Sequence, residues 1–275
     1  DKFKTYPLLY FSSDKEWFIT DQAKSVLDNI ESSEFNNEAI TTYLALGYLH
    51  GNHTFLNNCK IVEAGNWVML NNNSISKEYH NHIYPKIIID DDEIMVKAIN
   101  TLENAIKRTL SSIGNKPIWI PLSGGYDSRL LACVLKKMNI KNVKCFTYGF
   151  PNSLDVKISK KVAGTLGFPW FYVEYTKEKF ESLANSSIDD DYILWAMNLN
   201  TTSHYQDFIA IKELTERGVI EKNAIIIPGH SGEILGRDQI PYDLLESKKS
   251  IAELIYHKYF HWNFIKKGFK EPIFT

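Results

Sequence analysis

A short loop of glycine, serine and aspartate carries the strongest chemical pattern in the sequence. It reads Ser123-Gly124-Gly125-Tyr126-Asp127-Ser128 and follows an apolar run at 118–122. Paired glycines let the backbone approach a ligand closely, because no Cβ atom stands in the way. A helix that starts after the loop presents free N–H groups and the positive end of its dipole, which favour an anion. The pattern therefore predicts a phosphate-binding loop.

Side chains of the loop would add to such a site. The hydroxyl groups of Ser123 and Ser128 can donate hydrogen bonds to phosphate oxygens. The carboxylate of Asp127 is an oxygen ligand of the kind that a phosphate-bound Mg²⁺ takes. Arg129 follows, and both a contact with a phosphate and a pairing on the helix surface are open to it. The sequence has no G-x-x-x-x-G-K-[ST] motif, which excludes the loop of NTPases that cleave the γ-phosphate.

A second polar loop, Pro228-Gly229-His230-Ser231-Gly232-Glu233, follows another apolar run at 224–227. Its place after a strand is typical of the nucleophile elbow of serine hydrolases. That motif is G-x-S-x-G, and Glu233 stands where it needs the final glycine. His257 and His261 lie four residues apart, but the Glu of the zinc motif H-E-x-x-H is missing between them. Neither a serine hydrolase nor a zinc hydrolase is favoured.

From residue 85 onward, helical and strand patterns alternate. Strands are predicted by the apolar runs at 118–122, 143–148, 170–173 and 224–227. Helices are predicted at 94–110, 127–138, 154–166, 192–197 and 206–216. Residues 186–191, rich in Ser and Asp, are expected to form a solvated loop and a helix cap. The alternation predicts an α/β fold in which helices flank a parallel sheet.

Residues 1–84 have a different pattern of short strands, turns and two helices. Aromatic and β-branched runs around polar turns predict one hairpin at 6–20 and another at 61–70. The two helices are expected to begin after capping residues Asp21 and Asn37. This part is therefore predicted to be a small α+β domain.

The overall composition narrows the class of protein. The sequence has 275 residues with a formal net charge of −2, whereas proteins that coat nucleic acids or anionic membranes need a large positive excess. No apolar run approaches the roughly 20 residues that span a bilayer. Three scattered cysteines favour reduced thiols and a cytoplasmic location. Because the sequence starts at Asp1 without a Met or a signal peptide, we expect it to be part of a longer protein.

The loop at 122–128 resembles the pyrophosphate loop of the ATP pyrophosphatases, and the surrounding sequence resembles the asparagine synthetase family. The resemblance implies a fold like that of the adenine nucleotide alpha hydrolases over residues 85–275. Residues 1–84 resemble part of the glutaminase domain of class II amidotransferases, through Pro7-Leu8-Leu9-Tyr10 and the stretch 43–54. The implied small molecules are ATP and Mg²⁺.

The resemblance also implies roles for individual residues. The pyrophosphate would be bound by Ser123, Gly124, Gly125, Asp127 and Ser128, and the adenosine would be framed by Leu122, Phe146 and Thr147. Asp127 and Glu233 would be catalytic as ligands of Mg²⁺, and Gly229 would supply a backbone donor beside the substrate. His230 stands where the family usually has Asp, which favours a divergent branch related to asparagine synthase.

The implied activity is that of an ATP-dependent ligase. A small-molecule carboxylate attacks the α-phosphorus of ATP, pyrophosphate leaves, and ammonia turns the acyl-adenylate into an amide with release of AMP. Glutaminase domains of this type use an N-terminal Cys, whereas this sequence has no cysteine before Cys59, so we expect ammonia rather than glutamine to be the donor. No nucleic-acid or membrane partner is expected, and a homodimer is left open.

Two alternatives stay beside this interpretation. One is a ligase that amidates a sugar or peptide carboxylate in surface-polysaccharide or natural-product synthesis. The other is a nucleotide-binding module without catalytic activity.

Overall fold

The computed structural model describes residues 2–13, 16–30, 34–71, 74–80 and 91–229. They form two compact units, one built from residues up to 80 together with 185–203, and one from residues 91–184 together with 204–229. In this part of the chain, none of the helices combines the length and the apolar character of a membrane span. Four residues singled out in the sequence lie outside the described ranges: His230, Glu233, His257 and His261.

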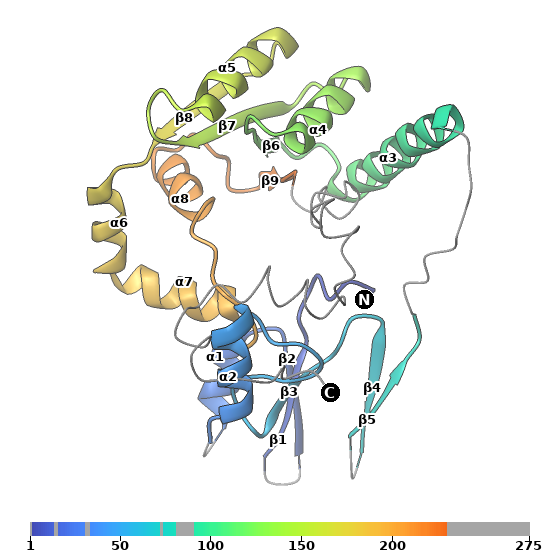
Figure 1. Ribbon diagram of the computed structural model, residues 1–275, viewed down its shortest axis with the longest axis vertical. Helices are drawn as coiled ribbons and strands as arrows, with labels where there is room; N and C mark the ends of the chain where they lie inside the picture. Colours follow the sequence, from blue (N-terminus) through green and yellow to red (C-terminus); the bar gives the residue numbers. More distant parts are fainter. Residues whose placement is uncertain (1, 14–15, 31–33, 72–73, 81–90, 230–275) are drawn as a thin grey trace, which may run out of the picture. The chain divides into compact units, whose positions relative to one another are not determined.

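The unit that carries the glycine-rich loop is built on a parallel sheet (Figure 1). Its strands are β6 (Ile118–Pro121), β7 (Val143–Gly149), β8 (Trp170–Glu174) and β9 (Ile225–Ile226). They lie in the order β8-β7-β6-β9, and every neighbouring pair is parallel. Strand β6 is therefore central, with Ile118 opposite Val143 on one side and opposite Ile225 on the other. The α/β fold with a parallel sheet flanked by helices is confirmed.

Helices cover both faces of this sheet because its strands are apolar on both sides. The helices of this unit are α3 (Asp91–Ile113), α4 (Tyr126–Lys137), α5 (Leu154–Leu166), α6 (Lys177–Ala184) and α8 (Phe208–Glu216). Ile118 and Ile120 pack with buried residues of α3, α4 and α5 on one face. Trp119, which points the other way, packs with residues of α6 and α8. The strand β6 is thus packed on both faces by hydrophobic cores, which fix the position of its carboxyl end.

The first unit is antiparallel. Its elements are β1 (Leu9–Ser13), β2 (Glu16–Thr20), α1 (Ala23–Asn29), α2 (Asn37–Leu46), β3 (Cys59–Ile61), β4 (Asn66–Leu70), β5 (Ser74–Glu78) and α7 (Ser187–Met197). The hairpin predicted at 6–20 is confirmed as the pair β1–β2. The hairpin predicted at 61–70 is wrong, because β3 pairs with β1 instead and β4 pairs with β5 across the next turn.

Three points of the helix predictions also need correction. Residues 186–191 are mostly helical, since α7 begins at Ser187. Helix α6 was not predicted, because it is polar along most of its length and buries only Leu183. The cap of α2 is Asn36 rather than Asn37, with its side chain accepting a hydrogen bond from the backbone N–H of Ala39 at 3.0 Å.

The cap of α1 comes from a residue that is distant in sequence. The Oδ1 atom of Asn198 accepts a hydrogen bond from the backbone N–H of Ala23 at 2.6 Å, and its Nδ2 atom donates to the carbonyl of Asp21 at 2.9 Å. Asp21 is therefore not the cap that the sequence predicted. Asn198 has a φ of +41°, a left-handed conformation that Asn tolerates better than most residues.

We expect Asn198→Gly to lower the free energy of unfolding by about 1–3 kcal/mol, because the buried N–H of Ala23 loses its acceptor. Glycine keeps the left-handed backbone accessible, so the loss reports the two hydrogen bonds. Urea denaturation followed by tryptophan fluorescence measures it. Asn152→Gly is the matched control: Asn152 also has a left-handed backbone, with a φ of +66°, but its side chain is exposed, so its loss should be smaller. A Gly variant as stable as the wild type would contradict the assignment of the cap.

Candidate functional site

The glycine-rich loop leaves the carboxyl end of β6 and runs directly into α4. Gly125 is the last residue before the helix and has extended backbone angles, with no side-chain cap on the first turn. Asp127 lies in that first turn with its side chain exposed. The strand, the loop and the helix thus follow one another as the sequence predicted.

Hydroxyl groups of the loop bond to the loop itself. The Oγ atom of Ser128 accepts a hydrogen bond from the backbone N–H of Ser123 at 3.1 Å, and the two Oγ atoms lie 3.1 Å apart. The Oγ atom of Ser123 in turn accepts from the N–H of Gly125 at 3.1 Å. Arg129 donates to the Gly125 carbonyl at 2.9 Å and lies over the ring of Tyr126. These bonds hold the turn in shape.

Asp155 approaches the same loop from the first turn of α5. Its Oδ1 atom accepts a hydrogen bond from the backbone N–H of Gly124 at 2.7 Å. A Cβ atom at position 124 would lie 2.8 Å from that oxygen and 3.4 Å from the Cα atom of Asp155. A side chain at position 124 would therefore displace the Asp155 carboxylate from its hydrogen bond with the backbone N–H.

Gly229 brings the second polar loop against the first. A Cβ atom at this position would lie 2.6 Å from the backbone nitrogen of Ser128 and 2.8 Å from its Cα atom. The order of the sheet explains the contact, because β9 lies beside β6 and residues 227–229 continue past its end. Of the second motif, Gly229 is the last residue that the structure describes, and it lies at the N-terminus of α4.

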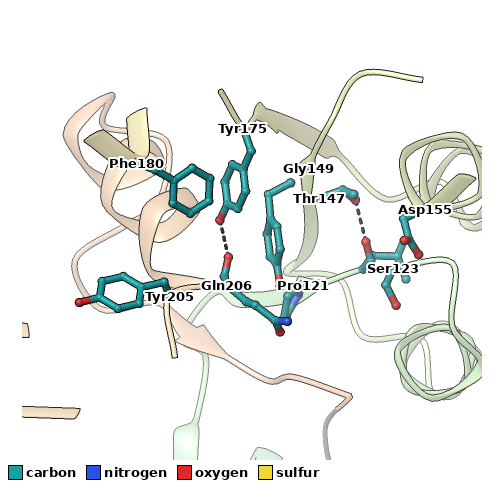
Figure 2. A pocket seen from close by; sticks show the side chains of 11 residues that line it. Pro121, Ser123, Thr147, Gly149, Asp155, Tyr175, Phe180, Tyr205 and Gln206 are labelled. Carbon is teal, nitrogen blue, oxygen red and sulfur yellow. Dashed lines mark hydrogen bonds between the residues drawn. The ribbon is translucent and has the colours of Figure 1, made fainter. Parts of the chain in front are cut away.

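A cavity of about 440 Å³ opens beside the loop, at the carboxyl ends of β6 and β7 (Figure 2). Ser123 and Asp155 lie at one end of it, and Tyr175 and Phe180 lie at the other. Its full lining is Pro121, Leu122, Ser123, Thr147, Tyr148, Gly149, Asp155, Tyr175, Phe180, Tyr205 and Gln206. Its volume falls within the roughly 300–1,000 Å³ that is usual for small-molecule sites. The cavity thus has a polar end at the loop and an aromatic end away from it.

The aromatic end is held together by ring contacts and one hydrogen bond. The rings of Tyr148 and Tyr175 stack with centroids 4.9 Å apart, and Phe180 meets Tyr175 edge-on at 5.5 Å. The hydroxyl of Tyr175 donates to the carbonyl of Gln206. Burial raises the pKa of both tyrosines well above the usual range, and the nearby Asp207 carboxylate raises the pKa of each further. Both side chains therefore stay neutral at physiological pH.

Of the three residues expected to frame an adenosine, Leu122 and Thr147 face the cavity, whereas Phe146 does not. Leu122 and Thr147 line the cavity, and the Thr147 hydroxyl donates to the Leu122 carbonyl at 2.7 Å. The side chain of Phe146 is fully buried in the core on the Trp119 face of the sheet. Its carbonyl accepts from the N–H of Leu122 at 2.8 Å, which extends the pairing of the two strands into the loop.

This geometry agrees with a match to a known family. Residues 97–216, which include the loop, α4, β7 and the cavity wall up to Gln206, match the model of the asparagine synthase family. Residues 97–216 are an asparagine synthase domain. Among proteins with curated descriptions, none matches the chain.

Two solved structures are similar to parts of the chain. One is an NH3-dependent NAD synthetase from Campylobacter jejuni in complex with the nitrate ion, at 20% identity and a TM-score of 0.37, covering 64% of this chain and 78% of that one. The other is a predicted subunit of a tRNA methyltransferase from Methanocaldococcus jannaschii, at 22% identity and a TM-score of 0.26. That match covers 42% of this chain and 52% of the methyltransferase subunit.

The asparagine synthase domain has carboxylates at the loop that suit magnesium. Asp127 is exposed at the start of α4, and Asp155 lies beside Gly124. Within the described ranges, no three His, Cys, Asp or Glu side chains are grouped so that they could hold a metal by themselves. Because Mg²⁺ is usually held by one or two carboxylates together with substrate phosphates and water, these residues fit an ion that arrives with a phosphate.

Sequence reasoning missed the aromatic end of the cavity. Tyr148 lies near the carboxyl end of β7, and Tyr175 directly follows the carboxyl end of the neighbouring parallel strand β8. Tyrosines at the same end of two neighbouring strands could have predicted that their rings meet. Phe180 gave no such signal, because it belongs to the unpredicted helix α6.

We expect Gly229→Ala to lower the free energy of unfolding of the unit that carries the glycine-rich loop by about 1–3 kcal/mol, since the new methyl group meets backbone atoms of α4 that cannot rotate away. Gly164→Ala is the matched control. Position 164 has nothing within 4 Å of a Cβ atom and lies inside α5, so the change should be neutral or stabilise by up to about 1 kcal/mol. Thermal unfolding measures both. Equal losses in the two variants would argue against the close approach at Gly229.

Proposed function

We propose that this protein is an ATP-dependent ligase that adenylates a small-molecule carboxylate, releases pyrophosphate and forms an amide with ammonia. The observation that carries the proposal is the Ser123–Ser128 loop. It opens a helix at the carboxyl end of the central strand, borders a cavity, and belongs to an asparagine synthase domain. Helix N-termini at such places favour anions, because free N–H groups and the dipole act together.

The proposal orients ATP along the cavity. The polar end, with Ser123 and Gly124, would take the β- and γ-phosphates, and the aromatic end near Tyr175 would take the adenine. Thr147 and Leu122, which lie between these ends, would contact the ribose. This direction is supported by charge and shape, since the loop offers N–H and hydroxyl donors and the other end offers flat apolar surfaces.

Two carboxylates are assigned to magnesium. Asp127 would bind the ion from the first turn of α4, and Glu233, which lies outside the described residues, would bind it from the second loop. When bound, Mg²⁺ would neutralise charge on the pyrophosphate as it leaves. Gly229 brings the second loop to the N-terminus of α4, which supports a role for its neighbours at this site.

The proposal divides the chain at residues 84 and 85. Residues 85–275 would form the ATP pyrophosphatase domain, and residues 1–84 would form part of a glutaminase-like domain. The antiparallel sheet β2-β1-β3 and the hairpin β4–β5 are compatible with such a domain. The structure differs from this division in one respect: residues 185–203 pack with the first unit.

Pyrophosphate release is the decisive measurement. We would incubate the protein with ATP, Mg²⁺ and ammonium, and add in turn aspartate, a uronic acid and a peptide with a free carboxylate. Release of pyrophosphate and AMP that depends on one carboxylate would support the ligase and identify its substrate class. Tight binding of ATP without pyrophosphate release from any carboxylate would instead support a nucleotide-binding module.

We expect Asp127→Asn to reduce the rate of pyrophosphate release by about 100-fold or more, because a neutral amide is a poor ligand for Mg²⁺. The asparagine side chain has nearly the same shape, so the fold should be kept, and circular dichroism checks this. Glu216→Gln is the control, since it removes one negative charge from an exposed ion pair at the end of α8. A folded Asp127→Asn variant with a near-normal rate would refute the role of Asp127.

A further inference from the structure

The short segment that follows α7 is anchored to the first unit by its backbone and by one buried side chain. The carbonyl of Leu199 accepts a hydrogen bond from the N–H of Phe55 at 3.0 Å. The carbonyl of Asn200 accepts from the N–H of Leu49 at 2.9 Å. The side chain of Asn200 is buried and donates to the carbonyl of His53 at 3.0 Å. Residues 199–200 are therefore fixed by the fold of the first unit.

Thr202 is anchored to the first unit as well. Its hydroxyl donates to the carbonyl of Gly47 at 2.6 Å and lies 3.3 Å from the hydroxyl oxygen of Tyr43. The segment that belongs to the first unit ends at Ser203, and two residues further on Tyr205 lines the cavity. Because consecutive Cα atoms are about 3.8 Å apart, so short a connection leaves Tyr205 little freedom once Thr202 is fixed.

Tyr205 and Gln206 form part of the cavity wall at its aromatic end (Figure 2). The carbonyl of Gln206 accepts from the hydroxyl of Tyr175, which itself lines this end. The ring of Tyr205 meets the ring of Phe208, at the start of α8, with centroids 6.5 Å apart. This part of the wall is thus held by Tyr175 and α8 after residue 205, and by the anchors at 199–202 before it.

We propose that Asn200 and Thr202 are positioning residues for this cavity: by fixing the chain in the first unit, they hold Tyr205 and Gln206 in the wall that receives the base of ATP. The inference rests on the proposed function, which assigns the adenine to the aromatic end. It goes beyond that function because it gives the first unit a part in nucleotide binding. The physical reason is preorganisation: a wall that is already ordered loses no backbone freedom when the ligand enters, and this raises the affinity.

Lengthening the connection tests the proposal. We would insert two glycines between Ser203 and His204, and measure the affinities for ATP and for inorganic pyrophosphate by calorimetry in the presence of Mg²⁺. We expect ATP to bind at least about ten-fold more weakly, because the backbone of at least one wall residue must then be ordered on binding. Pyrophosphate should bind as to the wild type, since it would contact the loop at the other end of the cavity. The control carries two glycines between Lys141 and Asn142, which are exposed in the connection from α4 to β7, and should bind both ligands normally.

A pair of isosteric substitutions tests the same point with a smaller change. Thr202→Val removes the hydroxyl that donates to the Gly47 carbonyl, and Thr202 is exposed, so the fold should be kept. We expect it to weaken the binding of ATP by about three-fold and to leave the binding of pyrophosphate unchanged. Thr41→Val is the matched control, because it also removes a hydroxyl bonded to a backbone carbonyl, but one within α2. It should bind ATP as the wild type does.

The outcomes separate this inference from the proposed function. Wild-type affinity for ATP in both the insertion variant and Thr202→Val would overturn the inference alone. Equal weakening of ATP and pyrophosphate would overturn it too, because a general loss of structure, and not a displaced wall, gives that result. No binding of either ligand to the wild type would refute the proposed function, and the inference with it. Thermal unfolding shows which variants are folded, and the pair Thr202→Val and Thr41→Val decides if the insertion variant is not.

Discussion

The pairing of β6 on both of its edges is the constraint on which the site depends. The backbone of this strand bonds to β7 on one side and to β9 on the other, and the pairing with β7 continues into the loop through the N–H of Leu122. A strand held at both edges and buried on both faces cannot shift along its axis without breaking both ladders. The position at which β6 ends is therefore well determined, and with it the position of the loop.

The same pairing determines where the cavity lies. From β6 the chain passes through α4 to β7 on one side, whereas β9 lies on the other side, so the connections diverge at the carboxyl end of β6. Sheets of this kind bind ligands at such a switch point, because the diverging chains leave a crevice there. Gly229 reaches the N-terminus of α4 for the same reason, since β9 delivers the second loop next to the first.

The hydrogen bonds within the loop explain how it can be both ordered and receptive. Each of these bonds joins a backbone group to a side chain: the N–H groups of Ser123, Gly124 and Gly125 bond to serine hydroxyls and to the carboxylate of Asp155, and the Gly125 carbonyl accepts from Arg129. Side chains can change partners when a ligand enters, at the cost of reorienting a few torsions, while the strand and the helix stay in place. The shape of the loop thus depends on side chains rather than on backbone pairing.

The sequence by itself determined the features that depend on neighbouring residues. Apart from α6, the alternation of strands and helices from β6 to β9 was predictable from apolar runs, and the place of the loop between a strand and a helix was predictable from its glycines, serines and aspartate. Tertiary structure decided which segments distant in the sequence pair or form hydrogen bonds with each other. Asn198 rather than Asp21 caps α1, β3 leaves the predicted hairpin to pair with β1, and Asp155 bonds to Gly124 across 31 residues. Local propensity sets which element a segment forms, but several partners can satisfy a given N–H group, and only the packing of the whole chain selects one of them.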